Sequence, residues 1–79
     1  MIPTINMLAT GAHIRELMDQ RGYSVKDIQQ RFGFYTPQAV YKWTKGKTLP
    51  TLDNLVILAS ILEVSVDDIL VLEWGEVPW

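Results

Sequence analysis

The side chains with the most informative chemistry lie on the outward face of one short stretch, residues 37–44. Gln38 can form two hydrogen bonds with adenine, Lys42 can donate to the acceptors of guanine, and the Ala39 methyl group can pack on that of thymine. Tyr41 adds an aromatic ring to this face. A short helix with such a face can enter a DNA major groove; the alternative for Gln38 and Lys42 is ordinary solvated helix surface.

A capped helix pattern precedes this stretch. Ser24 followed by Asp27 is the S-x-x-D arrangement in which side chains satisfy the free backbone amides of a helix start. Gly33 supplies a permissive residue at which such a helix can end. We therefore predict a helix over residues 25–32, joined to the second helix by a tight turn.

The second helix is predicted over residues 37–44. Thr36 is expected to cap it, with Pro37 at the first helical position, where a missing N–H costs nothing. Val40 and Trp43 are expected to face the core. These two anchors would hold the base-reading face outward.

Three further helices are predicted around this pair, so the expected fold is all-α. They span about residues 11–21, 52–62 and 66–71, with Thr10, Thr51 and Ser65 as their caps. The helix over residues 52–62 is expected to bury a broad face made of Leu52, Leu55, Val56, Leu58, Ala59 and Leu62. Residues 1–10 are expected to form an extended arm, because Pro3 argues against a helix there, and residues 72–79 an extended tail.

The charges are divided along the chain, although the formal net charge of -2 is unusual for a protein that binds a polyanion. Residues 1–52 hold seven basic and three acidic residues, a balance of +4, whereas residues 53–79 hold six acidic and no basic residues, a balance of −6. One end of the molecule can therefore meet DNA while the other avoids it. Chance unevenness in a small acidic protein is the alternative.

Several classes of function are not expected. The sequence has no cysteine, and its only histidine, His13, has no partner at metal-binding or catalytic spacing. We expect no enzyme activity, metal, cofactor or small-molecule substrate. No segment reaches the roughly 20 apolar residues of a membrane span, and the N-terminus lacks a signal-peptide pattern, so a cytoplasmic location is expected.

Over about residues 14–70 the chain resembles the Cro/CI family of helix-turn-helix DNA-binding proteins, also called lambda-repressor-like or XRE. The resemblance rests on the short polar segment KDIQQRFG, the V-x-x-W-x-x-G pattern from Val40, the L-P-T-L segment from Leu49 and the V-S-x-D-x-I pattern from Val64. It implies a five-helix domain over residues 11–71 that binds palindromic operators as a dimer.

The resemblance also implies roles for individual residues. It places Gln38, Ala39, Tyr41 and Lys42 at base-facing positions, and Thr36, Lys45 and Lys47 near phosphates. Their charge makes Lys26 and Arg31 further phosphate contacts, with a solvated face as the alternative. The Tyr35 phenol can bond phosphate or rest on a sugar, or else shield a neighbouring helix.

Three positions depart from the family pattern. The turn at residues 33–35 is one residue longer than is usual, which alters the expected angle of the second helix. Val25 stands where members often carry a glutamine that binds phosphate, and Pro37 where they often carry a polar, DNA-facing side chain. These departures reduce the expected DNA contacts and leave the expected fold unchanged.

The sequence holds more apolar residues than one small core uses, and exposed apolar patches often mark interfaces. We predict a homodimer through the fourth helix and the tail, with interface residues Ile57, Ile61, Leu72, Trp74, Val77 and Trp79. The alternative is that the tail folds back over its own monomer.

The predicted function is sequence-specific binding of double-stranded DNA by a prokaryotic or phage transcriptional regulator of the repressor type. The alternative is a protein-interaction module of the same fold, an antitoxin-like or anti-repressor partner with little DNA binding of its own.

Overall fold

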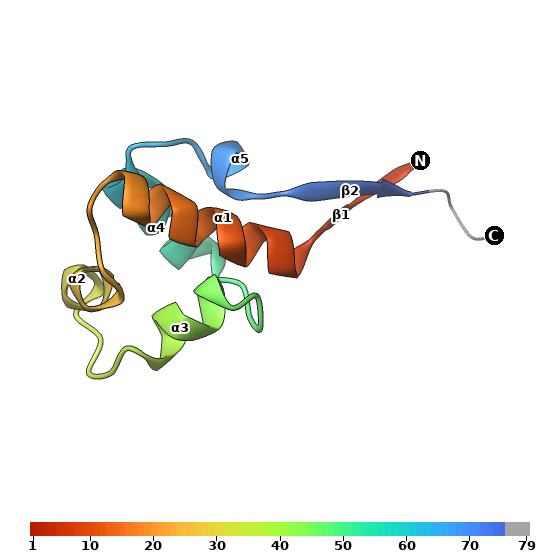
Figure 1. Ribbon diagram of the computed structural model, residues 1–79. Helices are drawn as coiled ribbons and strands as arrows, with labels where there is room; N and C mark the ends of the chain where they lie inside the picture. Colours follow the sequence, from red (N-terminus) through yellow and green to blue (C-terminus); the bar gives the residue numbers. More distant parts are fainter. Residues whose placement is uncertain (76–79) are drawn as a thin grey trace.

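The computed structural model describes residues 1–75. In this part of the chain, helices and strands follow one another as shown in Figure 1. They are β1 (Ile2–Ile5), α1 (Met7–Gln20), α2 (Val25–Phe32), α3 (Gln38–Thr44), α4 (Leu52–Leu62), α5 (Val66–Ile69) and β2 (Leu72–Gly75). The predicted five-helix fold is confirmed, and the two strands are a minor addition to the expected all-α class.

Every helix contributes to one apolar core. Its buried members are Ile14, Met18, Val25, Ile28, Val40, Trp43, Leu55, Leu58, Ala59, Leu62 and Ile69. Val40 and Trp43 have exposed fractions of 0% and 4%, which confirms them as the predicted anchors of α3. Burial of such side chains is worth about 1.5–3 kcal/mol each, so α3 is held firmly from beneath.

Helix α1 begins earlier than the predicted residue 11. The side chain of Asn6 accepts a hydrogen bond from the N–H of Ala9 (2.9 Å), so Asn6 is the cap and Thr10 is not. Thr10 is fully buried, and its hydroxyl accepts a hydrogen bond from the N–H of Val71 (3.0 Å). The prediction that Thr10 caps this helix was wrong because the Thr10 hydroxyl, which could have served as a cap, is bonded to Val71 near the other end of the described chain.

The other helix bounds are closer to prediction. The bounds 25–32 and 52–62 are confirmed, whereas α5 ends at Ile69 because Leu70 already has extended backbone (φ -79°, ψ 132°). The buried face of α4 is narrower than predicted, since Leu52 and Val56 are 82% and 60% exposed. Both therefore add apolar surface to the outside of the molecule.

A close contact between backbones fixes α3 against α1. A Cβ atom on Gly11 would lie 2.5 Å from the Trp43 carbonyl oxygen and 2.6 Å from the Gly46 nitrogen. A Cβ atom on Gly46, which has φ +70°, would lie 2.7 Å from both the Met7 oxygen and the Leu8 Cα. The first turns of α1 thus rest directly on the C-terminal end of α3, and glycine is required on both sides of the contact.

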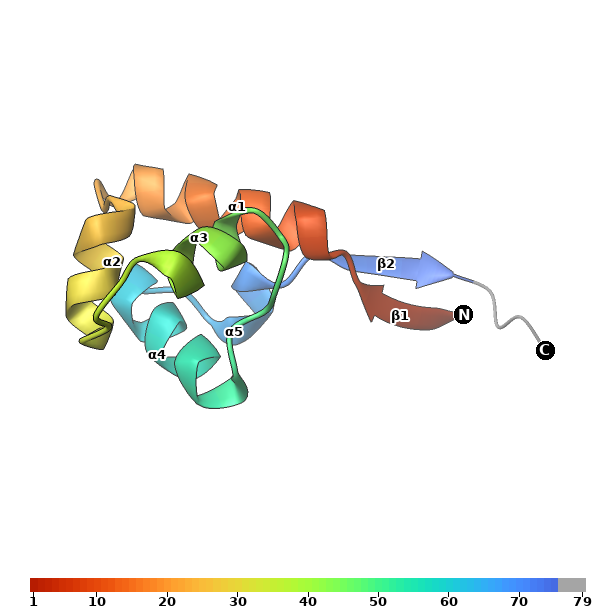
Figure 2. The same ribbon diagram turned by 90° about the horizontal axis from the view of Figure 1, so that it is seen from below.

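Strands β1 and β2 form an antiparallel ribbon that projects from one end of the helical body (Figures 1 and 2). The strands pair Ile2 with Gly75 and Ile5 with Leu72. The prediction of an extended tail is confirmed for residues 72–75; residues 76–79 lie outside the described residues. Within the predicted arm over residues 1–10, only residues 2–5 are a strand, because α1 starts at Met7.

The free energy of unfolding should fall in acid, because the carboxylates of two capping boxes lose their stabilising effect when they are protonated. The Ser24 backbone N–H donates to the Asp27 carboxylate (2.8 Å), the Ser24 hydroxyl assists, and together they lower the pKa of Asp27 below its usual 3.8. Ser65 lowers the pKa of Asp68 in the same way. Since each pKa is lower in the folded state, the stabilisation is present above about pH 4 and is lost as the pH falls through the folded pKa.

Acid unfolding followed by circular dichroism checks this. The double variant Asp27→Asn, Asp68→Asn is expected to be less stable than the parent at neutral pH and to depend less on pH below about pH 4. Asp53→Asn is the control, because Asp53 lies in the first turn of α4 but outside a capping box. Equal acid sensitivity of the parent and the double variant would contradict the assignment.

Candidate nucleic-acid interface

The turn between α2 and α3 is held in place by side chains that the sequence analysis did not single out. Gly33 ends α2 with left-handed backbone (φ 73°, ψ 23°), and the Phe34 N–H donates to the Gln29 carbonyl oxygen (3.1 Å). The side-chain amide of Gln29 in turn donates to the Phe34 carbonyl oxygen (3.2 Å). Gln29 thus makes two hydrogen bonds to Phe34, one through its backbone and one through its side chain, and both stabilise the turn. This role could not be predicted from the neighbouring sequence, because it depends on the path of the turn.

An aromatic cluster lies under this turn. The ring centroids of Phe32 and Phe34 are 5.0 Å apart, and those of Phe32 and Trp43 are 5.3 Å apart. Aromatic pairs at such distances contribute about 0.5–1.5 kcal/mol beyond their buried area. The cluster joins α2, the turn and α3, so the orientation of α3 is set by packing as well as by the glycine contact.

The start of α3 differs from the prediction. Pro37 is the N-cap residue, no side chain makes a capping hydrogen bond, and the helix begins at Gln38. The roles of Thr36 as cap and of Pro37 as first helical residue were therefore wrong. At the other end, Lys47 donates its backbone N–H to the Lys42 carbonyl oxygen (2.9 Å), which closes the helix.

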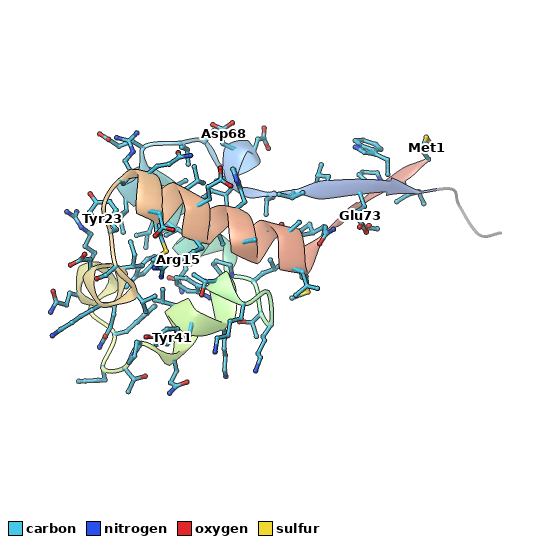
Figure 3. The ribbon with its side chains drawn as sticks, viewed as in Figure 1. Met1, Arg15, Tyr23, Tyr41, Asp68 and Glu73 are labelled. Carbon is cyan, nitrogen blue, oxygen red and sulfur yellow. The ribbon has the colours of Figure 1, made fainter. Side chains whose placement is uncertain are left out.

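The predicted base-facing residues lie on the outer side of α3. Gln38 and Lys42 are exposed, and Tyr41 is 44% exposed. Ala39 is half-buried and packs against the core, so only part of its surface faces out. Figure 3 shows Tyr41 on the side of the molecule opposite Asp68 of α5.

A shallow hollow brings several of these residues together. It is lined by Gly33, Phe34, Tyr35, Thr36, Gln38, Ala39, Lys42 and Thr48. Thr48, which follows α3, was not among the predicted site residues. Because Gln38 and Lys42 line the same hollow as Tyr35 of the turn, a ligand on this part of α3 would also meet Tyr35. Tyr41 lies outside the hollow, and the Lys45 ammonium group lies 5.7 Å from the centre of its ring.

All the predicted phosphate-contacting residues are exposed. They are Lys26, Arg31, Tyr35, Thr36, Lys45 and Lys47. Within residues 1–75, the ion pairs join Arg15 to Asp19 and Arg21 to Glu63. In the described structure Lys45 and Lys47 belong to neither pair, and neither do Lys26 and Arg31, whose charges add to the Ser24 hydrogen bonds in lowering the pKa of Asp27. The Arg31 guanidinium lies over the Tyr23 ring, 4.8 Å from its centre.

The predicted dimer residues lie in two separate places. Ile57, which is 44% exposed, and Ile61, which is half-buried, are on α4, within the helical body. Leu72 and Trp74, which are 45% and 61% exposed, are on the projecting strand β2 (Figure 2). Val77 and Trp79 lie outside the described residues. The structure therefore does not bring the two halves of the predicted interface together within one molecule.

Neither a metal site nor a membrane-spanning helix is found in residues 1–75. No cluster of three or more histidine, cysteine, aspartate or glutamate side chains there could hold a metal ion. None of the helices described is long and apolar enough to cross a membrane. His13 bonds through Nε2 to the Asp68 carbonyl oxygen (2.8 Å), which gives this histidine a packing role between α1 and α5.

Comparisons with known proteins agree with this geometry. A family model described as helix-turn-helix matches residues 14–69. The restriction-modification controller protein C.AhdI from Aeromonas hydrophila is similar in structure, with a TM-score of 0.72 and 22% identity over 81% of this chain and 96% of that one. The clp gene regulator ClgR from C. glutamicum has a TM-score of 0.68 and 19% identity, over 80% of each chain.

A third similar structure is the DNA-binding domain of BldD from S. venezulae. Its TM-score is 0.68, at 25% identity over 81% of this chain and 94% of that one. No curated protein matches the sequence.

Proposed function

The chain belongs to the helix-turn-helix family of Cro/CI-type regulators, and from this membership we propose that it binds double-stranded DNA sequence-specifically, as a prokaryotic or phage transcriptional regulator of the repressor type. The observation that carries the proposal is the outer face of α3, where Gln38 and Lys42 are exposed above the buried anchors Val40 and Trp43. The similarity to the DNA-binding domain of BldD at 25% identity supports it.

The proposed division of labour follows from residue type. Gln38 and Lys42 read base edges in the major groove, with Ala39 and Tyr41 beside them. The phosphate contacts come from Lys26, Arg31, Tyr35, Thr36, Lys45 and Lys47, which fix the register of the helix on the duplex without carrying sequence information. Of the acidic residues that follow α3, Asp68 lies on the side of the molecule opposite Tyr41 (Figure 3).

We also propose that the protein acts as a homodimer, because one such domain reads few base pairs and a two-fold pair doubles the contact. The proposed interface draws on the exposed apolar residues Ile57, Leu72 and Trp74, the half-buried Ile61, and Val77 and Trp79. Dimerisation would place two α3 helices in successive major grooves of a palindromic site.

Salt dependence of DNA binding tests the proposal. Duplexes selected from a random pool should be retarded in a gel at about 50 mM salt, and affinity should fall about 10³-fold or more by about 200 mM, as expected for six to ten phosphate contacts. Arg15→Ala is a suitable control variant, because Arg15 is already paired with Asp19 on α1. This variant should keep the parent's affinity and salt dependence. No retardation at low salt would refute DNA binding and favour the alternative protein-interaction module.

A further inference from the structure

The register of the β1–β2 ribbon gives it one apolar and one mixed face. Residues directly opposite each other in an antiparallel pair project to the same side, and sides alternate along each strand. The pairs Pro3 with Trp74 and Ile5 with Leu72 therefore share one face, which is wholly apolar. The other face carries Thr4 opposite Glu73 and Ile2 opposite Gly75.

The two outer edges of the ribbon differ in hydrogen-bonding capacity. The Asn6 N–H donates to the Val71 carbonyl oxygen (2.8 Å), and this pair continues the strand register by one step. Hydrogen-bonded pairs alternate along an antiparallel ladder, so the backbone groups of Leu72 and Trp74 point away from β1. The outer edge of β2 thus offers the N–H and C=O groups of both residues.

On the outer edge of β1, the outward positions are Pro3 and Ile5 by the same alternation. Pro3 has no N–H to donate, and a proline in this position blunts a strand edge. Only β2 therefore presents an edge that can accept another strand.

Side-chain hydrogen bonds join the ribbon to the helical body. The buried hydroxyl of Thr10 accepts from the Val71 N–H (3.0 Å), and the Asn6 side-chain amide donates to the Glu73 carboxylate (2.8 Å) while its oxygen caps α1. These contacts fix the direction in which β2 leaves α1. A strand held in place in this way loses little conformational freedom when it pairs with another.

The charge and polarity of the ribbon's side chains indicate which kind of partner it can bind. Its strands carry Glu73 as their only ionisable side chain, so they do not attract DNA or an anionic membrane. All the side chains of both strands are exposed, and a two-stranded ribbon on its own is only marginally stable in water. Edge-to-edge pairing of two ribbons across a two-fold axis would place their apolar faces side by side on one surface of the joined sheet, with Glu73 on the opposite surface.

We propose that β2 pairs with β2 of a second copy of this chain, in antiparallel orientation, to form a four-stranded sheet in the order β1-β2-β2-β1. This proposal rests on the homodimer proposed above and takes only the β2 residues of its interface as the contact. Leu72 and Trp74 of the two copies become neighbours across the new strand pair and cover part of each other's apolar surface. The assembly stops at two copies because Pro3 blunts both edges that remain outside.

Concentration-dependent hydrogen exchange on the full chain tests this contact. A single strand pair buries less than the ~800 Å² per partner of a standard stable interface, so we expect a dissociation constant of roughly 1–100 μM by sedimentation. The Leu72 and Trp74 amides should exchange at least about tenfold more slowly at ~1 mM protein than at ~1 μM. The Ile5 amide, on the blunted edge, should exchange rapidly at both concentrations.

Two substitutions at one position separate the backbone contribution from that of the side chain. Trp74→Pro removes the outward N–H without touching the β1–β2 ladder, whereas Trp74→Ala removes only the indole. The proline variant should dimerise at least about tenfold more weakly than the alanine variant, with unchanged helical circular dichroism in both. A dimer whose Leu72 and Trp74 amides remain unprotected would overturn this contact alone. A monomer at ~1 mM would overturn both the contact and the proposed homodimer, whereas absence of DNA retardation at low salt would overturn the proposed DNA binding and leave the contact standing.

Discussion

Gly46→Ala is expected to destabilise the protein far more than Gly22→Ala, although the two glycines have nearly the same left-handed backbone, with φ of 70° and 73°. Adding a Cβ atom to a left-handed residue costs about 1–2 kcal/mol in either position. At Gly22 nothing lies within 4 Å of the added atom. At Gly46 the added atom would lie 2.7 Å from the Met7 oxygen and 2.7 Å from the Leu8 Cα.

The extra cost at Gly46 arises because the obstructing atoms belong to backbone and cannot rotate away. Forcing atoms into packed surroundings typically costs about 1–3 kcal/mol more. The total of about 2–5 kcal/mol is a large share of the roughly 4–12 kcal/mol expected for a chain of this length. Urea unfolding followed by circular dichroism measures both variants. Equal losses would mean that α1 does not rest on the end of α3 as described.

Gly46→Ala should also weaken DNA binding in whatever protein remains folded. Relief of the contact requires the end of α3 to move away from α1, and α3 carries Gln38 and Lys42. Gly22→Ala leaves this contact untouched and should bind DNA as the parent does. The pair of variants therefore tests whether the glycine contact orients the proposed reading helix.

Local chemistry was enough to predict α2 and α4. A capping box starts α2 and a left-handed Gly33 ends it, so both bounds are present in adjacent residues. The Thr51 side chain caps α4 by accepting from the Asn54 N–H (3.3 Å), again within a few residues. Val40 and Trp43 could be assigned to the core because their spacing alone places them on one side of a helix.

The errors arose where distant parts of the chain meet. Gly11 stands at the predicted start of the first helix, and its role depends on the backbone of α3, more than thirty residues away along the chain. Thr10 resembles a cap, but its hydroxyl is used by Val71. Strands β1 and β2 are each only 4 residues long and lie at opposite ends of the described chain, so neither predicts the other.

The residues of the candidate interface could be predicted where they lie on or beside one helix, and not where distant parts of the chain bring them together. Gln38, Lys42 and Lys45 are exposed on or beside a helix whose inner side could be deduced from periodicity. The roles of Gln29 and Thr48 could not be deduced, because the first depends on the path of the turn and the second on how the chain returns past α3. Sequence identifies side chains on a helix face more readily than those that loops bring beside it.

Gln38→Ala and Lys42→Ala should each abolish most sequence-specific binding while leaving non-specific binding far less affected. A good contact to a base edge is worth about 1–3 kcal/mol of discrimination. A dimer makes each contact twice, so the loss in affinity for a selected palindromic duplex should be about 30-fold or more. Lys45→Ala should behave differently, since a phosphate contact weakens binding to all sequences alike and reduces the salt slope by about 1 per site.

Competition between the selected duplex and a scrambled one of equal length measures this difference. Gln20→Ala is the matched control, because Gln20 is an exposed glutamine on α1 whose side chain bonds to Glu16 on the same helix (3.5 Å). If Gln38→Ala retained the parent's preference for the selected duplex, α3 would not be the reading element. If Lys42→Ala instead lost affinity equally for both duplexes, Lys42 would be a phosphate contact, and specificity would have to come from Gln38 and the residues around the hollow.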